Sequence, residues 1–576
     1  MKYFLLFTFI FISSFSYSQK KGVFIADSDT AFSKSSDINM ISCDEQQIKN
    51  LDLLCKVWGF VKYYHPSIAA GKYNWDNELF RFLPKYLAVK TNEERNDTLF
   101  SWINNLGPVS GKGNKIKIKS NTKCVPNLDW ISDTTVFGSD LSNLLVNIKN
   151  TKRKKQHYYV SFLENIGNPV FKNERLYKDA SFNDFGIRVL TVFRYYNIIE
   201  YFFPHKNVIG ENWQDIPAEF IEKIILAEND FDVQKTILEM ITRINDTQAK
   251  TNFNEAFSNE FYGRNYANYK ISFIENYAVV SGYINPSLVA KNVDLQIGDI
   301  IMGIEGENTL KKVERLKNYS PASNDFSKLN VISQDLLRTN KRSLNITFVR
   351  NNKTSSSNVP CYPPSSLYTK KEISSSDIKP TWRFLTSEIG YIFLGTIENR
   401  DVPKMMRELR PTSGIIIDLR CVPSDFVVFS LSQYIHIQKT AFAKFSKTNI
   451  QNPGEFTFTK PVYAPKIKHP YNGKIVILVN ELTQDLAEYT AMSLGSTSTA
   501  TIIGSTTSGA NGNVSDVILP WGISTSFSGV GVYYPDGKET QRVGVTIDEI
   551  IRPSLSGFLF GRDEALEKAV QIIKNK

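Results

Sequence analysis

Histidine and cysteine are scarce in this chain, which has five of each among its 576 residues. The cysteines are widely spaced and form no Cys-x-x-Cys pair, so the sequence excludes a zinc ribbon and a thioredoxin-type redox motif. The histidines do not have the short spacing of metal ligands either. We therefore expect no metal site and no cofactor, and we expect the cysteines to be small buried apolar residues.

Long apolar runs are also rare, and the one that stands out lies at the start of the chain. Residues 3–12 are almost all apolar, and the small residues Ser16 and Ser18 follow where a signal peptidase would cleave. The run is short for a membrane span of about 20 residues, and no later stretch is long enough to cross a bilayer. The sequence predicts a signal peptide over residues 1–18 and an exported protein, periplasmic or extracellular, without stable membrane insertion.

Acidic residues are in the minority: 58 Asp and Glu stand against 68 Lys and Arg, which gives a formal net charge of +10. Part of the excess is local, in two clusters of basic residues within 112–123 and 149–155. We interpret them as solvated basic faces, which can contact an anionic envelope surface. An exported chain without a recognised nucleic-acid motif is not expected to bind nucleic acid.

The length of the chain predicts several domains, since one hydrophobic core does not extend over so many residues. In the N-terminal half, Pro66 and Trp75 recur as Pro204 and Trp213, with the same offset for both pairs. Each copy shows an aromatic helix ended by proline, a loop, a tryptophan and a second amphipathic helix, which indicates a duplicated helical unit. The aromatic residues are expected in the core, with a ligand-stacking platform as the alternative. The predicted boundaries are 43–108 and 181–262 for the two units and 109–180 for a basic connector.

A different pattern follows over residues 265–352, where short alternating strands surround a Leu-x-x-Gly-Asp turn at Leu295–Asp299. This order resembles a PDZ domain, which binds chain ends by adding a peptide as a strand to a sheet edge. The glycine-rich carboxylate-binding loop of PDZ domains has no obvious counterpart here. The predicted elements are strands at 269–274, 278–283, 300–304 and 344–350 and a helix at 332–338.

The last third of the chain alternates apolar strands with helices, a pattern typical of α/β domains. Residues 353–380 are rich in Ser, Lys and Pro and are predicted to be a linker, and residues 381–576 are predicted to be the α/β domain. The predicted elements are strands at 389–394, 414–419, 475–479 and 501–503 and a terminal helix at 563–570.

The most informative segment is a buried strand at Gly473–Asn480, followed by a turn and a helix start within Glu481–Tyr489. In α/β hydrolases such a turn exposes the nucleophile at the start of a helix. The segment resembles the nucleophile turn of the tail-specific, or C-terminal-processing, serine peptidases, and especially their tricorn-like branch. The resemblance covers the last third of the chain, together with the PDZ-like module and the helical part before it, and thus most of the mature chain. It implies a crotonase-like α/β fold in the last third, within a multidomain α+β protein. It places Asp485 where the family has its serine.

The resemblance also assigns the positions of the general base. One branch of the family uses a lysine in a glycine-rich loop, and Ala510 occupies that position. The tricorn-like branch uses a histidine, and Gln248 occupies its place. Glutamine has no basic nitrogen that could accept a proton. Glu539 and Gln541 lie near the place expected for the remaining acid.

Because the nucleophile and both bases are replaced together, the resemblance implies impaired hydrolysis. The strand end Asp418–Arg420 is like that of the family, but the glycines that help to form the oxyanion hole are replaced by Cys421–Ser424. The glycines expected at the peptide-binding groove are Gly509, Gly512, Gly529 and Gly531.

Two interpretations of Asp485 are open. In the first it is an acid in the first helical turn, favoured by the helix dipole, with Thr483 as the N-cap. In the second, Asp485 and Glu488 form a carboxylate pair on one helix face for acid–base chemistry or metal binding, which would need a third ligand.

The sequence therefore predicts an exported, proteolysis-related homologue of the serine-type peptidases that binds peptides or protein C-terminal tails. It leaves the enzymatic activity uncertain. An active relative or an envelope protein is a further candidate partner. Two alternative functions are open: an envelope carbohydrate-binding protein that stacks sugars on the repeated aromatic residues, and an active serine endopeptidase. The candidate nucleophiles for the second are Ser493, Ser505 and Ser508.

Overall fold

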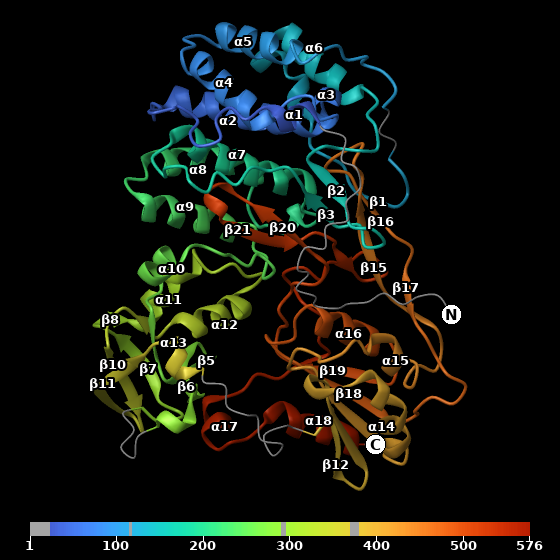
Figure 1. The fold of residues 1–576 in the computed structure, drawn as a ribbon. Coiled ribbons are helices and arrows are strands. Elements are labelled where there is room, and N and C mark those ends of the chain that lie inside the picture. Colours follow the sequence, from blue (N-terminus) through green and yellow to red (C-terminus); the bar gives the residue numbers. More distant parts are fainter. Residues whose placement is uncertain (1–23, 115–117, 290–294, 369–379, 576) are drawn as a thin grey trace.

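The computed structural model describes residues 24–114, 118–289, 295–368 and 380–575. The chain is a multidomain protein of mixed α and β structure, with helices in its N-terminal part, a β-rich part and an α/β part (Figure 1). The predicted signal peptide lies outside the described residues. Within them, no helix is both long and apolar enough to cross a bilayer. All five cysteines are free; Cys55 and Cys361 are buried, and the other three are half-buried.

The N-terminal part contains three helices that recur at the offset seen in the sequence. The first set is α2 Glu45–Tyr64, α4 Trp75–Leu87 and α5 Asn92–Asn104, and the second is α7 Phe185–Phe202, α8 Ile216–Leu226 and α9 Asp230–Thr242. The first and last residues of α9 are separated from those of α5 by the same number of residues that separates Trp213 from Trp75. The repeated unit is thus larger than the two helices that the sequence pattern indicated.

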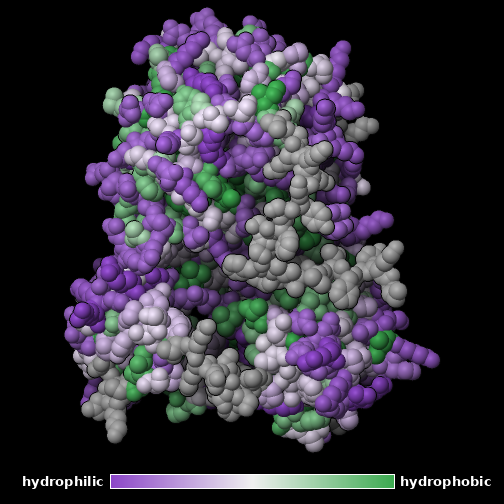
Figure 2. Space-filling model, viewed as in Figure 1, coloured by the Kyte–Doolittle hydropathy of each residue, from purple (hydrophilic) through white to green (hydrophobic). Residues whose placement is uncertain are grey.

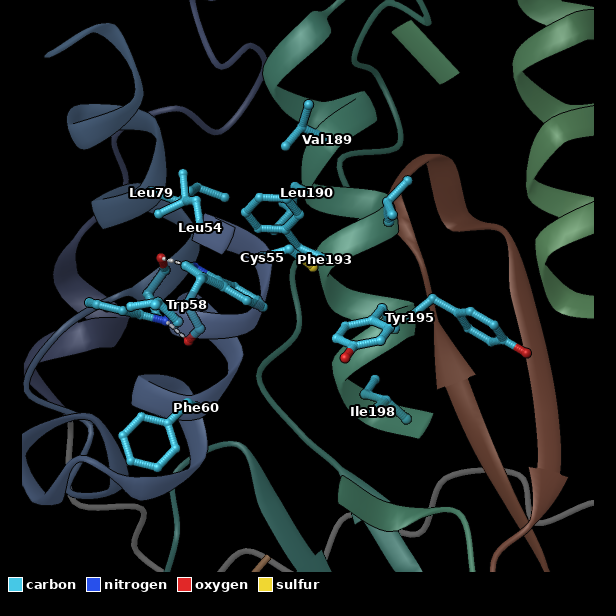
Figure 3. Packing of buried hydrophobic residues seen from close by; sticks show 14 of the residues in the cluster. Leu54, Cys55, Trp58, Phe60, Leu79, Val189, Leu190, Phe193, Tyr195 and Ile198 are labelled. Carbon is cyan, nitrogen blue, oxygen red and sulfur yellow. Dashed lines mark hydrogen bonds between the residues drawn. The ribbon is translucent and has the colours of Figure 1, made fainter. Parts of the chain in front are cut away.

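Hydrogen bonds repeat at the same offset. The Trp75 Nε1–H donates to the carbonyl of Trp58 at 2.9 Å, and the Trp213 Nε1–H donates to the carbonyl of Tyr196 at 3.2 Å. Figure 3 shows the Trp58 bonds beside the helix pair α2 and α7, where the Trp58 and Phe193 rings pack 5.9 Å apart. Trp58, Trp75 and Trp213 are at most 5% exposed. These tryptophans form the core, so they provide no surface on which a sugar could stack.

The connector is more structured than its sequence indicated, because it contains α6 Thr134–Asn150. Its buried leucines recur at helical spacing, but polar residues and Gly138, at φ 69°, interrupt the pattern in the sequence. Helix α6 packs on α5, and strand β1 Thr122–Cys124 pairs with β16 Phe456–Phe458 of the C-terminal part. The segment thus joins the first helical unit to the α/β part.

The β-rich part is a sheet whose main strands run in the order β5, β6, β7, β10 and β11. Asp299 ends the turn at Leu295–Asp299. It is buried and accepts two hydrogen bonds from Arg350, at 2.7 and 2.6 Å. The strands are β5 Tyr269–Ile274, β6 Tyr277–Tyr283, β7 Ile300–Ile304, β10 Ser343–Arg350 and β11 Lys353–Tyr362, and the helices are α11 Thr309–Lys317 and α12 Asp325–Asp335.

Two predictions for this part are corrected. The helix expected at 332–338 begins earlier, after the N-cap Asn324, and Arg338 already belongs to β9 Arg338–Thr339. The stretch predicted to be a linker begins with β11. The first half of this strand is exposed and Ser-rich, so its composition is that of a loop. Residues 369–379 of that stretch lie outside the described residues.

The α/β part is built on a sheet with the order β12-β13-β14-β18-β19-β23, in which β13 through β23 run parallel. Alternate residues of its central strands face two apolar layers, one with helices α14 to α16 and the other with α18. Burial on both faces explains why β18 is an unbroken run of Ile, Val and Leu after its first residue. The bounds are β12 Trp382–Thr386, β13 Ile389–Phe393, β14 Gly414–Asp418, β18 Lys474–Val479, β19 Ala500–Gly504, β23 Glu549–Ile550, α14 Val402–Leu409, α15 Val428–Ser432, α16 Leu486–Leu494 and α18 Glu564–Lys574.

Candidate functional site

The turn between β18 and α16 holds Asp485 in an unusual backbone conformation. Asp485 has φ 51° and ψ −110°, and a positive φ is uncommon for any residue other than glycine. Its N–H donates to the carbonyl of Ala510 at 3.2 Å, and its carbonyl accepts from the N–H of Tyr489 at 2.9 Å. The nucleophile turn of α/β hydrolases is a sharp, strained strand-to-helix turn of this kind.

The predicted capping of α16 is wrong. Asp485, and not Thr483, is the N-cap, so the aspartate precedes the first helical turn. The Thr483 hydroxyl accepts from the N–H of Asn480 at 3.0 Å and donates to the carbonyl of Leu419 at 2.8 Å, beyond the end of β14. The threonine therefore fixes the turn against the neighbouring strand end, a role that its spacing from the helix does not reveal.

The carboxyl group of Asp485 lies among groups from two other segments, residues 246–250 and the loop at Gly512. Burial raises its pKa to about 6, and the nearby charge of Asp246 also raises it. The Gly512 N–H, the ammonium of Lys250 and the side-chain amide of Gln248 act in the opposite direction. The structure thus brings Asp485 and Gln248 together, and it adds Lys250 and the Gly512 N–H to the site.

Gln248 is positioned by the buried carboxylate of Asp246. This carboxylate accepts hydrogen bonds from the Gln248 N–H at 3.0 Å and from the Ser528 N–H at 2.6 Å. The Gln248 carbonyl in turn accepts from the Ser526 hydroxyl at 2.5 Å. Both serines lie on β21 Ser524–Ser528, so the segment after α9 is held against the C-terminal part of the chain.

Glu488, on the first turn of α16, holds the glycine-rich loop that contains Ala510. Its buried carboxylate accepts from the Thr507 hydroxyl, from the Gly509 N–H at 2.8 Å and from the Ala510 N–H at 3.1 Å. Burial raises its pKa to about 7. Both carboxylate oxygens are engaged by the loop, so Glu488 acts as its anchor, and no metal-binding group of three or more His, Cys, Asp or Glu occurs in the described part of the chain.

The four glycines expected at the groove divide into two pairs. Gly509 and Gly512, at φ 64° and 122°, lie in the loop beside Asp485 and Glu488. Gly529 and Gly531 use their N–H groups within the chain, toward the Asn513 carbonyl at 2.8 Å and the Ser446 hydroxyl at 2.7 Å. The first pair therefore borders the site. The N–H groups of the second pair are used in hydrogen bonds within the domain.

Comparison with known proteins identifies the domain that carries this turn. Residues 388–551 match the model of peptidase family S41. This part of the chain belongs to peptidase family S41. The S41 domain thus contains the turn at Asp485, the glutamate anchor and the glycine-rich loop.

Solved structures with the same fold cover the larger part of the chain. Mature CPAF in complex with lactacystin is similar with a TM-score of 0.53 and 12% identity, over 68% of this chain and 98% of that chain. Mature CPAF alone gives a TM-score of 0.52 and 12% identity, over 68% and 97% of the two chains. At such identities the likeness shows the fold alone. No curated protein matches this sequence.

The three alternative serines of the S41 domain lie in other surroundings. The carbonyl of Ser493 accepts from His436 Nε2 at 2.9 Å, while its buried hydroxyl has no hydrogen-bond partner among the described residues. The Ser505 hydroxyl lies 3.4 Å from Glu481 Oε2, and the Ser508 hydroxyl 3.4 Å from that of Ser327. In the hydrogen bonds of the described residues, none of the three hydroxyls has a histidine to take its proton.

The two residues near the expected third acid serve the interface between parts of the chain. Glu539 lies 2.9 Å from His205 Nδ1 and 3.2 Å from Lys123 Nζ. Although burial raises its pKa, these partners hold it at about 2. The side-chain amide of Gln541 donates to the Ser323 hydroxyl at 3.5 Å. Glu539 therefore ties the S41 domain to the end of α7 and to the connector.

A cavity of about 640 Å³ lies beside the turn, and nothing in the sequence pattern indicated it. The S41 domain contributes Glu481, Gln484 and Ser508, and the rest of the wall comes from residues 247–251 and from α10 Glu255–Phe261, α11 and α12. Segments that are far apart in the sequence thus form one space. Such a space depends on how the domains pack, which no local pattern encodes.

Proposed function

We propose that this protein is an exported member of peptidase family S41 that binds peptides or protein tails and whose hydrolytic step is impaired. The observation that carries the proposal is Asp485 itself, in the strained turn with Gln248 beside it. The backbone of a nucleophile turn is retained, while the side chains that hydrolysis needs are replaced.

The chemistry of these side chains opposes acyl transfer. A serine peptidase needs a hydroxyl nucleophile, a base that takes its proton and donors that face the developing oxyanion. With a pKa of about 6, Asp485 is mostly an anion at neutral pH, and the nearby Gly512 N–H stabilises that anion. A negative charge at this point repels an oxyanion, and Gln248 cannot accept a proton.

Peptide binding is supported by two surfaces that this substitution leaves in place. Strand β5 stands at the end of its sheet and, within the described residues, pairs only with β6, so its other edge can accept a peptide strand in the manner of a PDZ domain. Helix α12 packs beside β5. The cavity between α10–α12 and the S41 domain leads from this part of the chain to the turn at Asp485.

Binding and hydrolysis can be separated in one experiment. Purified protein is titrated against fluorescent tail peptides by anisotropy, and the same preparation is incubated with an unfolded protein and with a fluorophosphonate probe. We expect saturable binding without cleavage and without labelling. Labelling of the unaltered protein would contradict the impaired step, and no binding at high micromolar peptide would contradict the peptide-binding role.

Export is proposed from residues 1–18 of the sequence. Expression of the whole chain in a bacterial host, followed by fractionation and mass spectrometry of the N-terminus, tests it. We expect a mature chain that starts at Gln19 and is recovered outside the cytoplasm. An intact Met1 in the cytoplasmic fraction would contradict this part of the proposal.

A further inference from the structure

The cavity beside the turn has two walls of different origin. One wall is the S41 domain together with residues 247–251, and the other is formed by α10, α11 and α12. Figure 2 shows the molecule hollowed between its lower left part, which carries α10–α12, and its lower right part, which is the α/β domain. A ligand in this space contacts Gln484, the residue next to Asp485.

Four basic side chains line the cavity, and two of them are already paired. Arg338 lies 2.9 Å from Asp335, and Arg315 lies 3.1 Å from Glu307. Lys250 and Lys312 have no carboxylate within 4.0 Å anywhere in the described part of the chain. Lys250 acts at longer range on the carboxylate of Asp485, and Glu307 and Glu305 act at longer range on Lys312. Among the described residues, neither ammonium group is in an ion pair with the lining acids, Asp335 and Glu481.

Lys312 is the less solvated of the two ammonium groups. It lies on α11 and is half-buried, whereas Lys250 is exposed. Burial lowers the pKa of Lys312, although the charge of Glu307 opposes this effect. A charge that is partly removed from water is stabilised when an opposite charge lies close to it. A carboxylate that entered the cavity would supply the missing partner.

Aromatic residues complete the lining on the same side. Phe261 and Tyr319 pack edge to face with ring centroids 5.3 Å apart, and Tyr262 follows Phe261 at the end of α10. Apolar surface beside an unpaired cation suits a carboxylate carried on a short hydrocarbon stem. The side chains of aspartate and glutamate have this form.

We propose that the cavity selects peptides with acidic side chains, and that Lys312 and Lys250 are the residues that bind the carboxylate. This inference rests on the proposed peptide-binding function and adds the class of peptide to it. Lys312 contributes its ammonium group from α11, and Lys250 contributes one from the segment that also acts on the carboxylate of Asp485.

The test uses the full mature protein and three short fluorescent peptides with amidated C-termini. They share one sequence except at two central positions, which are Glu, Gln or Lys. We expect the Glu peptide to bind about tenfold more tightly than the Gln peptide, the Lys peptide to bind most weakly, and the preference to shrink at high salt. Because every C-terminus is amidated, a chain-end carboxylate does not contribute.

Variants assign the preference to the cavity. Lys312→Gln should weaken binding of the Glu peptide about tenfold and leave the Gln peptide unchanged, Lys250→Gln should act in the same direction, and Lys312→Arg should retain the preference. The matched control is Lys311→Gln, an exposed neighbour on α11 that does not line the cavity. Circular dichroism and thermal unfolding of each variant separate a binding effect from a folding defect.

Each outcome bears on one statement. Equal affinity for the three peptides overturns the selectivity and leaves peptide binding intact, whereas no binding of any peptide overturns the proposed function. A Gln peptide with a free C-terminus that matches the amidated Glu peptide would show that the chain end is bound instead, which also overturns the inference. A preference that Lys312→Gln and Lys250→Gln both leave unchanged would overturn the assignment to this cavity.

Discussion

The side-chain amide of Gln248 stabilises the carboxylate of Asp485 across the boundary between the helical part and the S41 domain. The sequence resemblance predicts a histidine base and a serine nucleophile at these two positions. A side-chain amide has no basic nitrogen, so Gln248 cannot take a proton from a hydroxyl. The contact stabilises the Asp485 anion and provides no base for a neighbouring hydroxyl.

The first prediction is that hydrolytic chemistry can be restored at this contact. The double variant Asp485→Ser/Gln248→His puts a hydroxyl in the strained turn and an imidazole beside it. We expect fluorophosphonate labelling of the double variant and none of the unaltered protein. The single variant Asp485→Ser should label at least about a hundredfold more slowly, because it lacks the base.

A control separates this site from the other serines. The triple variant that adds Ser508→Ala should label like the double variant, since the Ser508 hydroxyl contacts that of Ser327, which is not a base. Mass spectrometry should place the probe on residue 485. Labelling at Ser493, Ser505 or Ser508 would show that the nucleophile lies elsewhere.

The second prediction concerns the pH dependence of stability. Burial raises the pKa of Asp485 to about 6, so the folded state keeps this proton over a pH range in which the unfolded chain has lost it. The contribution of Asp485 to stability therefore falls as the pH rises from about 4 to about 6. Asp485→Asn removes this loss, and we expect the variant to gain on the order of 2 kcal/mol at pH 7 relative to pH 4.

The measurement is urea unfolding of both proteins at several pH values. Asp97→Asn, at an exposed position of α5, is the control and should leave the pH profile unchanged. A difference between Asp485→Asn and the unaltered protein that does not vary with pH would contradict the prediction. Glu488, whose pKa burial raises to about 7, titrates in both proteins. The charge of Asp485 adds the smallest of the contributions to that pKa, so Asp485→Asn changes the titration of Glu488 only slightly.

The third prediction tests the contact between the two helical units. Gly59 on α2 faces Asn197 on α7, and the offset between these positions is that of the repeat, so the helices meet at equivalent points. A Cβ atom at Gly59 would lie 1.7 Å from Asn197 Oδ1. Asn197 is fixed by a hydrogen bond to the carbonyl of Cys55 at 2.9 Å. We expect Gly59→Ala to cost about 1–3 kcal/mol of stability.

Denaturant unfolding and a double-mutant cycle check this contact. Lys49→Ala, on the exposed side of α2, should change stability by no more than about 0.5 kcal/mol. Gly59→Ala/Asn197→Ala should lose less than the sum of the single changes, because the second change removes the atoms that clash. Strict additivity would show that the two residues do not constrain each other.

The parts of the fold that the sequence predicts are those with a local physical cause. Strand β18 is buried on both faces, so its residues are apolar after the first, and the repeated helices preserve tryptophan and proline at a fixed spacing. Strand β11 could not be predicted from the sequence, because its exposed half is Ser-rich and its position is set by pairing with β10. Helix α6 could not be predicted either, because Gly138 and polar residues interrupt the helical spacing of its apolar residues.

In the candidate site, too, only the features with a local cause could be predicted from the sequence. The resemblance at 473–489 identifies the turn, since a buried strand and a helix start are local features. Other features depend on segments that meet only in the folded chain. They are the positive φ of Asp485, the effect of the Lys250 charge on Asp485 and the hydrogen bonds of Glu488 to the glycine-rich loop. A local pattern can therefore indicate the turn that carries Asp485, but it cannot indicate the groups that surround this residue.

The fourth prediction concerns Glu488 as the anchor of the glycine-rich loop. Its carboxylate accepts three hydrogen bonds, from the Thr507 hydroxyl and from the N–H groups of Gly509 and Ala510. In Glu488→Gln, one oxygen becomes an NH₂ group that faces a donor, so at least one buried N–H loses its acceptor. We expect a loss of about 1–3 kcal/mol in stability and faster hydrogen exchange over residues 505–513.

Hydrogen exchange distinguishes this local effect from a general loss of stability. Protection should fall in the loop and remain in β18 and β14, because those strands are held by the sheet and not by Glu488. The Glu488→Gln change should also weaken fluorophosphonate labelling in the restored double variant, since the Gly512 N–H lies in the same loop and borders residue 485. If the loop kept its protection while the whole protein was destabilised uniformly, the anchoring role would be contradicted and Glu488 would be an ordinary buried acid of the helix.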